Sequence, residues 1–469
     1  MSEGLAPGVE HFLRPGTLQL GALPPLALYV HLPWCIRKCP YCDFNSHELG
    51  APRLPAVATP PVGSGRTARP GSGVDLPSPR LAVVAGPRGT PSLNAASGSG
   101  LEAALEQRYL DALRADLEAS LPLIWGRRVL SIFIGGGTPS LFSPQGIDRL
   151  LGEIRARVTL EPGAEITLEA NPGTFERERF KAYRAAGVTR LSIGVQSFDD
   201  RALKKLGRVH DAAQARAAVT EAAEAFDTFN IDLMYALPGQ TLDGLRQDLE
   251  TALSFAPPHL SVYHLTIEPN TMFALQPPVL PDNDLASDML DLLVERMAAV
   301  GLERYEVSAF ARPGHRCQHN LNYWQFGDYL GIGAGAHGKL SFPHRVLRQV
   351  RWREPAAYMQ QALAGSAVSN QHEVQRRDLP FEYMLGALRL RDGFDLARFG
   401  ERTGLPLSAV QAALERAQQR GLIDLEDGGW VRPSVRGFDF LSDLQALFLP
   451  PTERKGASPS HPQAPTQPA

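Results

Sequence analysis

Short apolar runs alternate with amphipathic stretches through the first two thirds of the chain. Six runs have the length of buried strands: Ala27–His31, Val129–Ile134, Glu165–Glu169, Thr189–Ile193, Asn230–Leu233 and Leu260–His264. Helical spacing follows several of them, at Phe175–Ala186, Ala212–Ala225 and Leu242–Phe255. Strands that alternate with helices predict a parallel sheet that is covered on both faces.

Six such units are compatible with an open sheet or with an incomplete barrel. Polar motifs follow the carboxyl ends of the strands, and a barrel gathers the loops at those ends into one site. The pattern therefore predicts an α/β fold built on an incomplete (βα)6 barrel.

The pattern changes after about residue 373, where helical periodicity dominates. Phe381, Met384, Leu385 and Leu388 form one apolar stripe, and shorter helices follow near Leu396 and Val410. Two short apolar runs around Asp427-Gly428-Gly429 then indicate a hairpin. These elements predict a C-terminal, mostly helical, winged-helix-like domain. Winged modules often bind DNA, but the expected second helix, 408–420, mixes acidic and basic residues, so no nucleic-acid partner is expected.

Composition divides the chain further. Residues 49–100 are dense in Pro, Gly, Ser and Ala and predict a disordered, low-complexity insertion with one weak strand-like run at Leu81–Ala85. The expected segments are 1–48 for the first strand and its loop, 49–100 for the insertion, 101–280 for the rest of the barrel, 281–372 for a barrel-closing region, 373–449 for the winged-helix-like domain and 450–469 for a disordered tail.

Charge and hydropathy narrow the cellular setting. The 469 residues contain 47 Lys and Arg against 50 Asp and Glu, so the net charge of −3 gives no general attraction to nucleic acid or acidic lipid. No apolar run reaches the roughly 18 residues of a membrane span, and the N-terminal region lacks a signal-peptide pattern. A cytoplasmic protein is expected, with at most a peripheral membrane contact, in a compartment where thiols stay reduced.

Three of the four cysteines, Cys35, Cys39 and Cys42, lie in the loop after the first predicted strand. Thiolates at this spacing suit an iron–sulfur cluster, and three ligands on a four-iron cluster leave one iron open to a further ligand. Zinc with His47 as a fourth ligand is an alternative. A disulfide would leave one thiol over, and three buried structural cysteines fit poorly with the charged residues between them.

Polar residues recur just past the predicted strands. The glycine run Gly135–Thr138 follows the second strand, Glu169 ends the third, Gln196 and Arg208 follow the fourth, and Asp232 lies in the fifth. Glycines allow close backbone approach, carboxylates suit ribose hydroxyls or an ammonium group, and Arg suits a carboxylate. This set predicts a site for an amino-acid nucleoside.

The sequence HNLNYW at residues 319–324 offers a second type of site. The His319 imidazole can ligate iron, and Tyr323 and Trp324 can face a flat porphyrin. A packed Tyr–Trp pair with His319 capping a turn is the structural alternative. Cys317 is expected to be a small buried residue, and the glycines of 331–338 are expected to permit close packing.

Taken together, these motifs resemble the radical S-adenosylmethionine (SAM) family. The cysteine motif with GGGTP resembles the family as a whole, GVQSF and the run around Asp232 resemble its coproporphyrinogen oxidase-like branch, and HNLNYW resembles the haem chaperones of that branch. The resemblance implies that Cys35, Cys39 and Cys42 bind a [4Fe-4S] cluster whose open iron takes SAM. It implies the following SAM-lining residues: Tyr29, Gly136, Gly137, Thr138, Glu169, Gln196, Arg208 and Asp232.

The function implied by the resemblance is that of a haem chaperone. Such a protein would bind haem through His319, receive electrons from a reducing donor, and transfer haem to an acceptor protein. The alternative is an oxygen-independent coproporphyrinogen III oxidase, an enzyme that decarboxylates propionate side chains. Its motif has a fourth cysteine where this chain has Phe44, which favours the chaperone and leaves catalysis open.

Overall fold

The computed structural model describes residues 12–49, 101–173 and 176–450. The predicted insertion at 49–100, with the weak strand at 81–85, therefore lies outside the described residues except for Leu49. The predicted tail at 450–469 lies outside them except for Pro450. Among the described helices, none is both long and apolar enough to cross a membrane.

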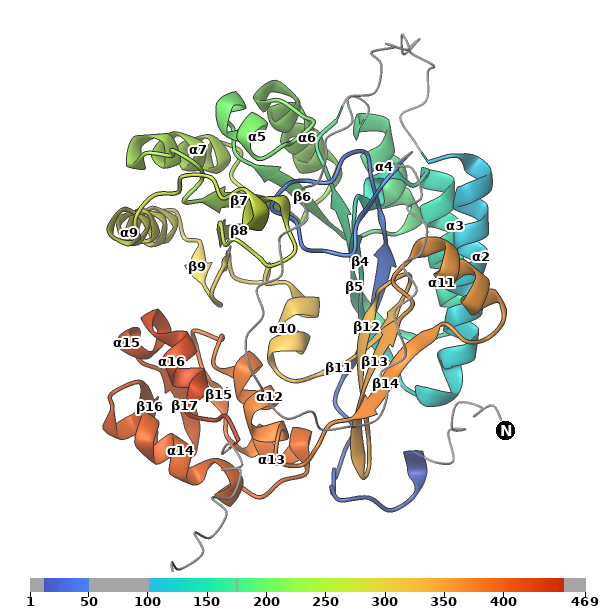
Figure 1. The fold of residues 1–469 in the computed structure, drawn as a ribbon, viewed down its shortest axis with the longest axis vertical. Coiled ribbons are helices and arrows are strands. Elements are labelled where there is room, and N and C mark those ends of the chain that lie inside the picture. The colour runs from blue at the N-terminus through green and yellow to red at the C-terminus, as the bar shows by residue number, and fades with distance from the viewer. Residues whose placement is uncertain (1–11, 50–100, 174–175, 451–469) are drawn as a thin grey trace, which may run out of the picture.

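Six parallel strands form the centre of the molecule, as predicted (Figure 1). They are β1 (Leu26–Leu32), β4 (Val129–Gly136), β5 (Leu160–Ala170), β6 (Arg190–Gln196), β7 (Phe229–Tyr235) and β8 (His259–His264), paired in that order. The helices between and after them are α2 (Ala103–Ser120), α3 (Pro144–Arg155), α4 (Glu176–Ala186), α5 (Asp200–Lys205), α6 (Ala212–Ala225), α7 (Leu242–Ser254) and α9 (Asn283–Ala299). Apart from the first half of β5 and the last two residues of β8, the strands are mostly buried, because their apolar side chains pack in the main hydrophobic core.

The sheet continues beyond this centre on both sides. Beside β1 lie β11 (Asp328–Ile332), β12 (His337–Phe342), β13 (Arg345–Arg351) and β14 (Val368–Glu373); beside β8 lie β10 (Ala309–Ala311) and β9 (Glu303–Arg304). Among the described residues the terminal strands, β14 and β9, do not pair with each other, so the barrel is incomplete as predicted.

A smaller C-terminal domain packs beside the open side of the sheet (Figure 1). It contains α12 (Leu379–Ala387), β15 (Phe394–Asp395), α13 (Ala397–Thr403), α14 (Ser408–Gln419), β16 (Ile423–Leu425), β17 (Trp430–Pro433), α15 (Val435–Asp439) and α16 (Leu441–Ala446). The strands form a small sheet in the order β15–β17–β16. This helix and strand order agrees with the winged-helix-like prediction.

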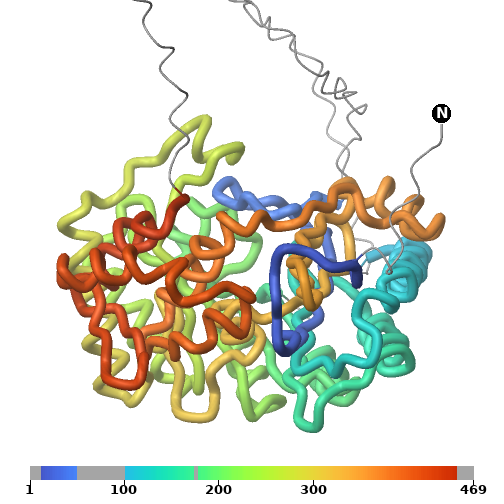
Figure 2. The backbone as a smooth tube through the Cα atoms, turned by 90° about the horizontal axis from the view of Figure 1, so that it is seen from below, coloured from blue at the N-terminus to red at the C-terminus, as the bar shows by residue number. Residues whose placement is uncertain are grey.

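The segment before β1 joins the two parts (Figure 2). Leu18 and Leu20 are buried in the core of the C-terminal domain. Their backbone N–H groups donate to the carbonyls of His344 and Pro343, in the turn between β12 and β13. The C-terminal domain is thereby attached to the extended edge of the sheet.

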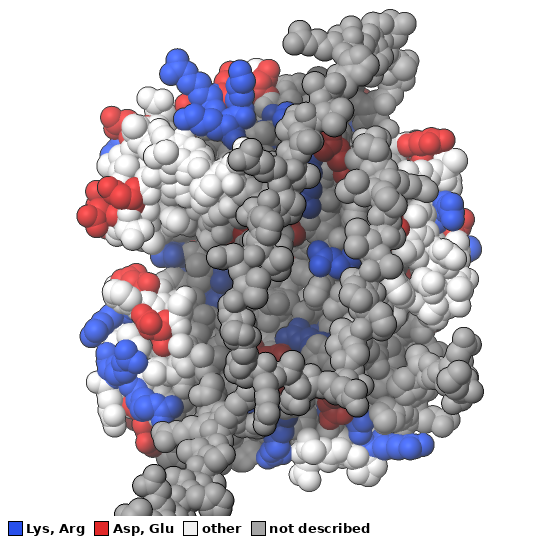
Figure 3. All heavy atoms as spheres, in the orientation of Figure 1, with Lys and Arg blue, Asp and Glu red and all other residues white. Residues whose placement is uncertain are grey.

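Charges on the surface are mixed in sign. Figure 3 shows acidic and basic side chains interspersed on the visible face, with a local basic group at the end of the molecule that carries α5 to α7 in Figure 1. This distribution is in keeping with the net charge of −3.

A buried ion pair fixes α2 against the extended sheet. Both Arg351 of β13 and Asp116 of α2 are almost completely buried, and their side chains approach to 3.2 Å. The Asp116 carboxylate also accepts hydrogen bonds from the Tyr358 hydroxyl (3.0 Å) and the Gly333 N–H (3.3 Å). Tyr358 lies on α11 (Pro355–Leu363), so this one carboxylate joins four segments of the chain.

We predict that Asp116→Ala strongly destabilises the protein. The substitution leaves the Arg351 charge buried without its partner, which costs about 3–5 kcal/mol. Asp111→Ala, one and a half turns earlier on α2, removes a carboxylate that is 41% exposed and paired with Arg149. That control should cost less than about 1 kcal/mol. Urea unfolding followed by circular dichroism measures the free energy of unfolding of both variants. An equal decrease in the two variants would contradict the role given to Asp116.

Candidate functional site

The cysteine loop leaves β1 through a short strand, β2 (Trp34–Cys35), and returns through β3 (His47–Glu48), which pairs with it. All four cysteines of the chain are free thiols, and the three in the loop are half-buried. Each sulfur of the loop lies beside a side chain that can donate a hydrogen bond. The contacts are Thr138 Oγ1 to Cys35 Sγ (3.6 Å), Arg208 Nη1 to Cys39 Sγ (3.6 Å) and Ser46 Oγ to Cys42 Sγ (3.7 Å).

The donor set of this loop suits an iron–sulfur cluster. The three thiols line one cavity of about 370 Å³, and His47 is not among the residues that line it. Among the described residues, no three His, Cys, Asp or Glu side chains converge as the ligands of a single ion do. Burial raises the pKa of the Cys35 and Cys42 thiols, so metal binding would release protons.

His31, at the end of β1, connects the cysteine loop to the neighbouring strands. Its Nε2 lies 3.0 Å from the carbonyl of Asn45, which can only accept, so Nε2 carries the proton. Nδ1 therefore accepts from the Tyr29 hydroxyl at 2.9 Å. Burial lowers the pKa of His31 to about 4, which keeps the ring neutral.

The glycine run after β4 fits closely against this histidine. Gly136 has φ +122°, and a Cβ at this position would lie 2.8 Å from the His31 ring. A Cβ on Gly137 would lie 2.6 Å from the carbonyl oxygen of Trp34. Because glycine avoids both clashes, the backbone can approach the cysteine loop, and the Gly136 N–H donates to Glu169 Oε2 at 3.1 Å.

Asn171 joins two of the predicted site residues and was not itself predicted. Its Nδ2 donates to Thr138 Oγ1 at 2.7 Å, and its Oδ1 accepts from Arg208 Nη2 at 2.6 Å. The same Arg208 nitrogen donates to the Gly194 carbonyl at 2.7 Å. The available signal was its position two residues after Glu169, just past the end of β5.

Gln196 occupies a strained backbone position. Its φ is +69°, which is uncommon for a residue other than glycine, and the pairing of β6 with β7 is irregular between Gly194 and Gln196. Strain of this kind is frequent where a side chain is aimed at a ligand. Here it turns Gln196 toward the cavity that the cysteines line.

Two carboxylates face the same cavity. Burial and the nearby Asp232 raise the pKa of Glu169 to about 8, and the bond from Gly136 only partly opposes this. Burial raises the pKa of Asp232 to about 6, against hydrogen bonds from Asn230 (2.8 Å) and Ser192 (3.0 Å). A cationic ligand would relieve the repulsion between the two groups.

The structure brings most of the predicted site residues together. The 370 Å³ cavity is lined by Cys35, Cys39, Cys42, Gly136, Gly137, Glu169, Gln196, Arg208 and Asp232. Thr138 lines an adjoining cavity of about 240 Å³ together with Cys39 and Arg208. Tyr29 lines a larger cavity of about 1360 Å³ together with His319. Gly136 and Glu169 line both the smaller and the larger cavity.

His319 lies on α10 (Gln318–Trp324), between the sheet and the C-terminal domain (Figure 1). Its Nδ1 contacts Ser131 Oγ at 3.2 Å, and its backbone N–H donates to Glu165 at 3.2 Å. Burial lowers the pKa of the ring to about 3, so the imidazole is neutral, the form that ligates metal. Among the described residues, its Nε2 makes no hydrogen bond.

The other residues of HNLNYW divide between the cavity and the fold. Tyr323 and Trp324 line the larger cavity with rings perpendicular at 5.0 Å, and Tyr323 is 43% exposed, so this pair is not a packed core. His319 does not cap α10: the residue at the cap is Cys317, a buried thiol as expected. The Asn322 amide donates to the Asp328 carbonyl at 2.9 Å.

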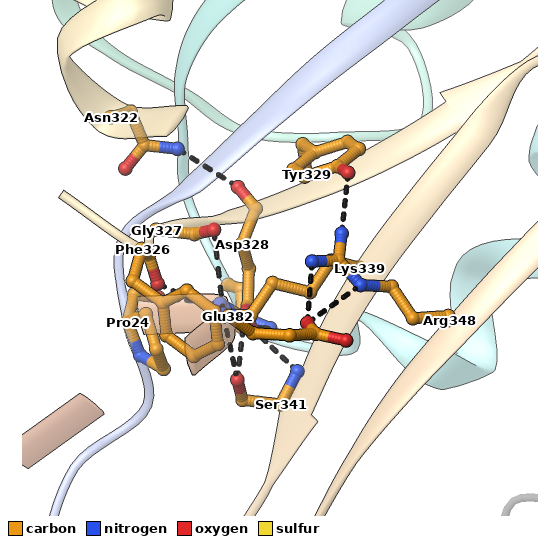
Figure 4. Close-up of polar contacts among 11 residues, drawn as sticks. Pro24, Asn322, Phe326, Gly327, Asp328, Tyr329, Lys339, Ser341, Arg348 and Glu382 are labelled. Carbon is orange, nitrogen blue, oxygen red and sulfur yellow. Dashed lines mark hydrogen bonds and ion pairs between the residues drawn. The ribbon is translucent and has the colours of Figure 1, made fainter. Parts of the chain in front are cut away.

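A buried polar cluster supports this side of the cavity (Figure 4). The Lys339 ammonium contacts Asp328 at 3.0 Å and lies 3.8 Å from the centre of the Phe326 ring. Asp328 also accepts from the Ser341 hydroxyl (2.7 Å) and pairs with Arg127 (2.8 Å). Burial lowers the pKa of Lys339 to about 8, although Asp328 opposes the change. These contacts fix the start of β11 and the second half of β12 to the end of α10.

Family models match both parts of the chain. The radical SAM superfamily model matches residues 108–252, and the model of the HemN C-terminal domain matches residues 374–440. The fold resembles that of the coproporphyrinogen III oxidase HemN from Escherichia coli, with a TM-score of 0.68. The similarity covers 91% of this chain and 90% of HemN. Because the two sequences are only 22% identical, it shows a shared fold and no shared activity.

Curated relatives are similar over nearly their whole length. The heme chaperone HemW of Haemophilus influenzae is 42% identical over 91% of this chain and 98% of the relative. HemW of Escherichia coli is 41% identical over 91% and 99%, and HemW of Mycobacterium tuberculosis is 34% identical over 85% and 89%.

We predict that Glu169→Gln reduces the pH dependence of stability. The folded protein raises the Glu169 pKa from 4.5 to about 8, so between these values it holds a proton that the unfolded chain releases. Stability therefore falls as the pH rises through this window. The glutamine variant should show a shallower fall in the urea midpoint, measured without added SAM. The exposed Glu161, on the same strand, provides the control: Glu161→Gln should keep the parent slope. A parent-like slope in Glu169→Gln would refute the prediction.

Proposed function

The chain belongs to the HemW family of radical SAM proteins, and on this premise we propose that it is a haem chaperone. It binds haem, a [4Fe-4S] cluster and SAM, and it transfers haem to an acceptor protein. The observation that carries the proposal is the position of His319. Its neutral ring lines a cavity of about 1360 Å³ that shares Gly136 and Glu169 with the cysteine-lined cavity.

The larger cavity has the chemistry that a metalloporphyrin requires. His319 offers Nε2 to iron, while its Nδ1 is held by Ser131. Phe133, with its ring centre 5.1 Å from that of His319, and the Tyr323–Trp324 pair provide flat apolar surfaces. The centre of the Tyr29 ring lies 6.5 Å from that of His319, and Tyr29 lines this cavity beside Gly136 and Glu169, so it would line SAM at the border with the haem cavity.

The smaller cavity suits the cluster and its cosubstrate. Cys35, Cys39 and Cys42 would hold the [4Fe-4S] cluster, which supplies an electron when it is bound and reduced. Glu169 and Asp232 would hold the ammonium and hydroxyl groups of SAM. Arg208 would pair with a carboxylate, because Asn171 and Gly194 already hold its guanidinium in place. Gly136, Gly137, Thr138 and Gln196 complete the wall around the ligand.

The shared wall suggests how the two sites act together. Phe44 is 62% exposed and lines both cavities, as do Gly136 and Glu169. A ligand in the smaller cavity therefore changes the surroundings of the larger one. In this proposal the cluster and SAM regulate the binding or release of haem, and the haem itself is cargo.

The proposed partners follow from this role. A reducing electron donor supplies the cluster, and an acceptor protein receives the haem. We place the activity in the cytoplasm, because the thiols that hold the cluster must stay reduced.

Two substitutions should separate the haem site from the cluster site. His319→Ala is predicted to weaken haem binding and to change the haem spectrum, while the iron–sulfur absorbance stays at the parent level. Cys39→Ala is predicted to abolish the iron–sulfur absorbance. The measurement is an anaerobic haem titration of the reconstituted protein, followed by transfer to a haem-free acceptor.

The control is His344→Ala. His344 lies in the β12–β13 turn, where its ring contacts the Leu18 carbonyl at 3.1 Å, away from both cavities. This variant should keep both spectra. An unchanged haem affinity and spectrum in His319→Ala would assign the iron ligand elsewhere, and a full four-iron complement in Cys39→Ala would reject the cluster assignment.

The competing activity is that of an oxygen-independent coproporphyrinogen III oxidase. We predict that the reduced, cluster-loaded protein with SAM and coproporphyrinogen III yields no protoporphyrinogen, since Phe44 replaces the fourth cysteine of that enzyme's motif. The porphyrin products are measured by chromatography after oxidation. Substantial decarboxylation would replace the chaperone proposal by the enzymatic one.

A further inference from the structure

One wall of the larger cavity is the extended edge of the sheet, and it carries basic side chains in register. Lys339 of β12 pairs with Arg348 of β13, which in turn pairs with His372 of β14. Side chains of directly paired residues lie on the same face of a sheet. All three residues line the cavity, as does Arg353, which follows β13. We refer to Lys339, Arg348, His372 and Arg353 as the basic wall.

The cations of this wall differ in whether they already have a partner. Lys339 is buried against Asp328. Arg348 is held between Glu382 and the Tyr329 hydroxyl, both at 2.7 Å. Arg353 is exposed, and among the described residues its guanidinium forms no ion pair and no hydrogen bond, while its backbone carbonyl accepts from Asn45 Nδ2.

The charges of Arg353 and Arg348 both affect the same histidine, His337. Partial burial lowers the pKa of His337, and both guanidinium groups lower it further. His337, Arg348 and Arg353 all line the same cavity. A ligand with two carboxylates would find one arginine already oriented by Glu382 and Tyr329 and a second with all its donors available.

The basic wall is connected to the HNLNYW helix. The Tyr323 and Tyr329 rings have centres 5.1 Å apart, and the Tyr329 hydroxyl accepts from Arg348. An aromatic path therefore leads from the residues near His319 to the arginines. Haem has groups that match these residues in order: a metal at its centre for His319, a flat apolar ring for the aromatic side chains, and two propionates along one edge for the arginines.

We propose that the two haem propionates bind at Arg353 and Arg348 of the basic wall, while the iron faces His319. This inference rests on the proposed haem function and adds the orientation of the haem in its cavity. The propionate edge would point toward β13 and the apolar edge toward α10 and α12.

The test compares haem with haem dimethyl ester, in which both propionates are neutral. Each ligand is titrated anaerobically into the cluster-loaded full chain, as the parent and as Arg353→Ala. Loss of one charge-assisted contact should weaken haem binding roughly tenfold in Arg353→Ala. The ester should bind the parent more weakly than haem does, and it should bind the parent and the variant equally.

Two further variants exclude other causes. Arg353→Lys keeps a positive charge and should restore much of the haem affinity. Arg246→Ala removes an exposed arginine on α7, far along the chain from the basic wall, and should behave as the parent.

Equal binding of haem and its ester by the parent would overturn the propionate assignment while leaving the haem chaperone proposal intact. Equal weakening of both ligands in Arg353→Ala would also overturn it, because the effect would not depend on carboxylates. Failure of the parent to bind either ligand would instead reject the proposed function itself.

Discussion

The contacts of the His31 side chain hold the walls of both cavities in place. Its ring holds the cysteine loop through the Asn45 carbonyl and the larger cavity through the Tyr29 hydroxyl, and it leaves room only for glycine at 136. Its backbone carbonyl accepts from the Tyr109 hydroxyl of α2 at 2.8 Å. That hydroxyl accepts from the Ala334 N–H, two residues past β11, also at 2.8 Å. Because burial keeps the ring neutral, one tautomer satisfies both side-chain contacts, and no charge is buried without a partner.

A second buried network joins the opposite sides of the site. Asn230 donates to Asp232 and contacts His259 at 2.7 Å, and His259 contacts the Tyr305 hydroxyl at 2.8 Å. That hydroxyl accepts from the backbone N–H of Cys317, at the start of α10, at 3.3 Å. The helix that carries the proposed haem ligand and the carboxylate of the smaller cavity are therefore fixed by the same hydrogen-bonded chain. Buried networks of this kind, when every member has a partner, hold side chains in one arrangement.

The local sequence was sufficient to predict elements whose hydrophobic pattern is periodic and motifs whose residues are close together in the chain. All six central strands, the α14 helix and the cysteine loop follow from runs of neighbouring residues. That Tyr29 also lines the cavity of His319 could not be predicted from the sequence, because strand register decides which cavity a side chain enters. Asn171 was missed because its two contacts come from distant loops. The basic wall could not be predicted from the sequence either, because Lys339, Arg348 and His372 come together only through the pairing of three strands.

Electrostatics links the two cavities through Glu169. With a pKa of about 8, this group holds a proton at neutral pH while Asp232 lies near it. A cation bound in the smaller cavity would lower the pKa of Glu169 and favour its charged form. The new charge would lie on a residue that also lines the larger cavity, beside the Gly136 N–H that donates to it. Occupancy of the smaller cavity would thus alter the field around His319 without moving an element of the fold. The state of one cavity can therefore be transmitted to the other through one shared carboxylate.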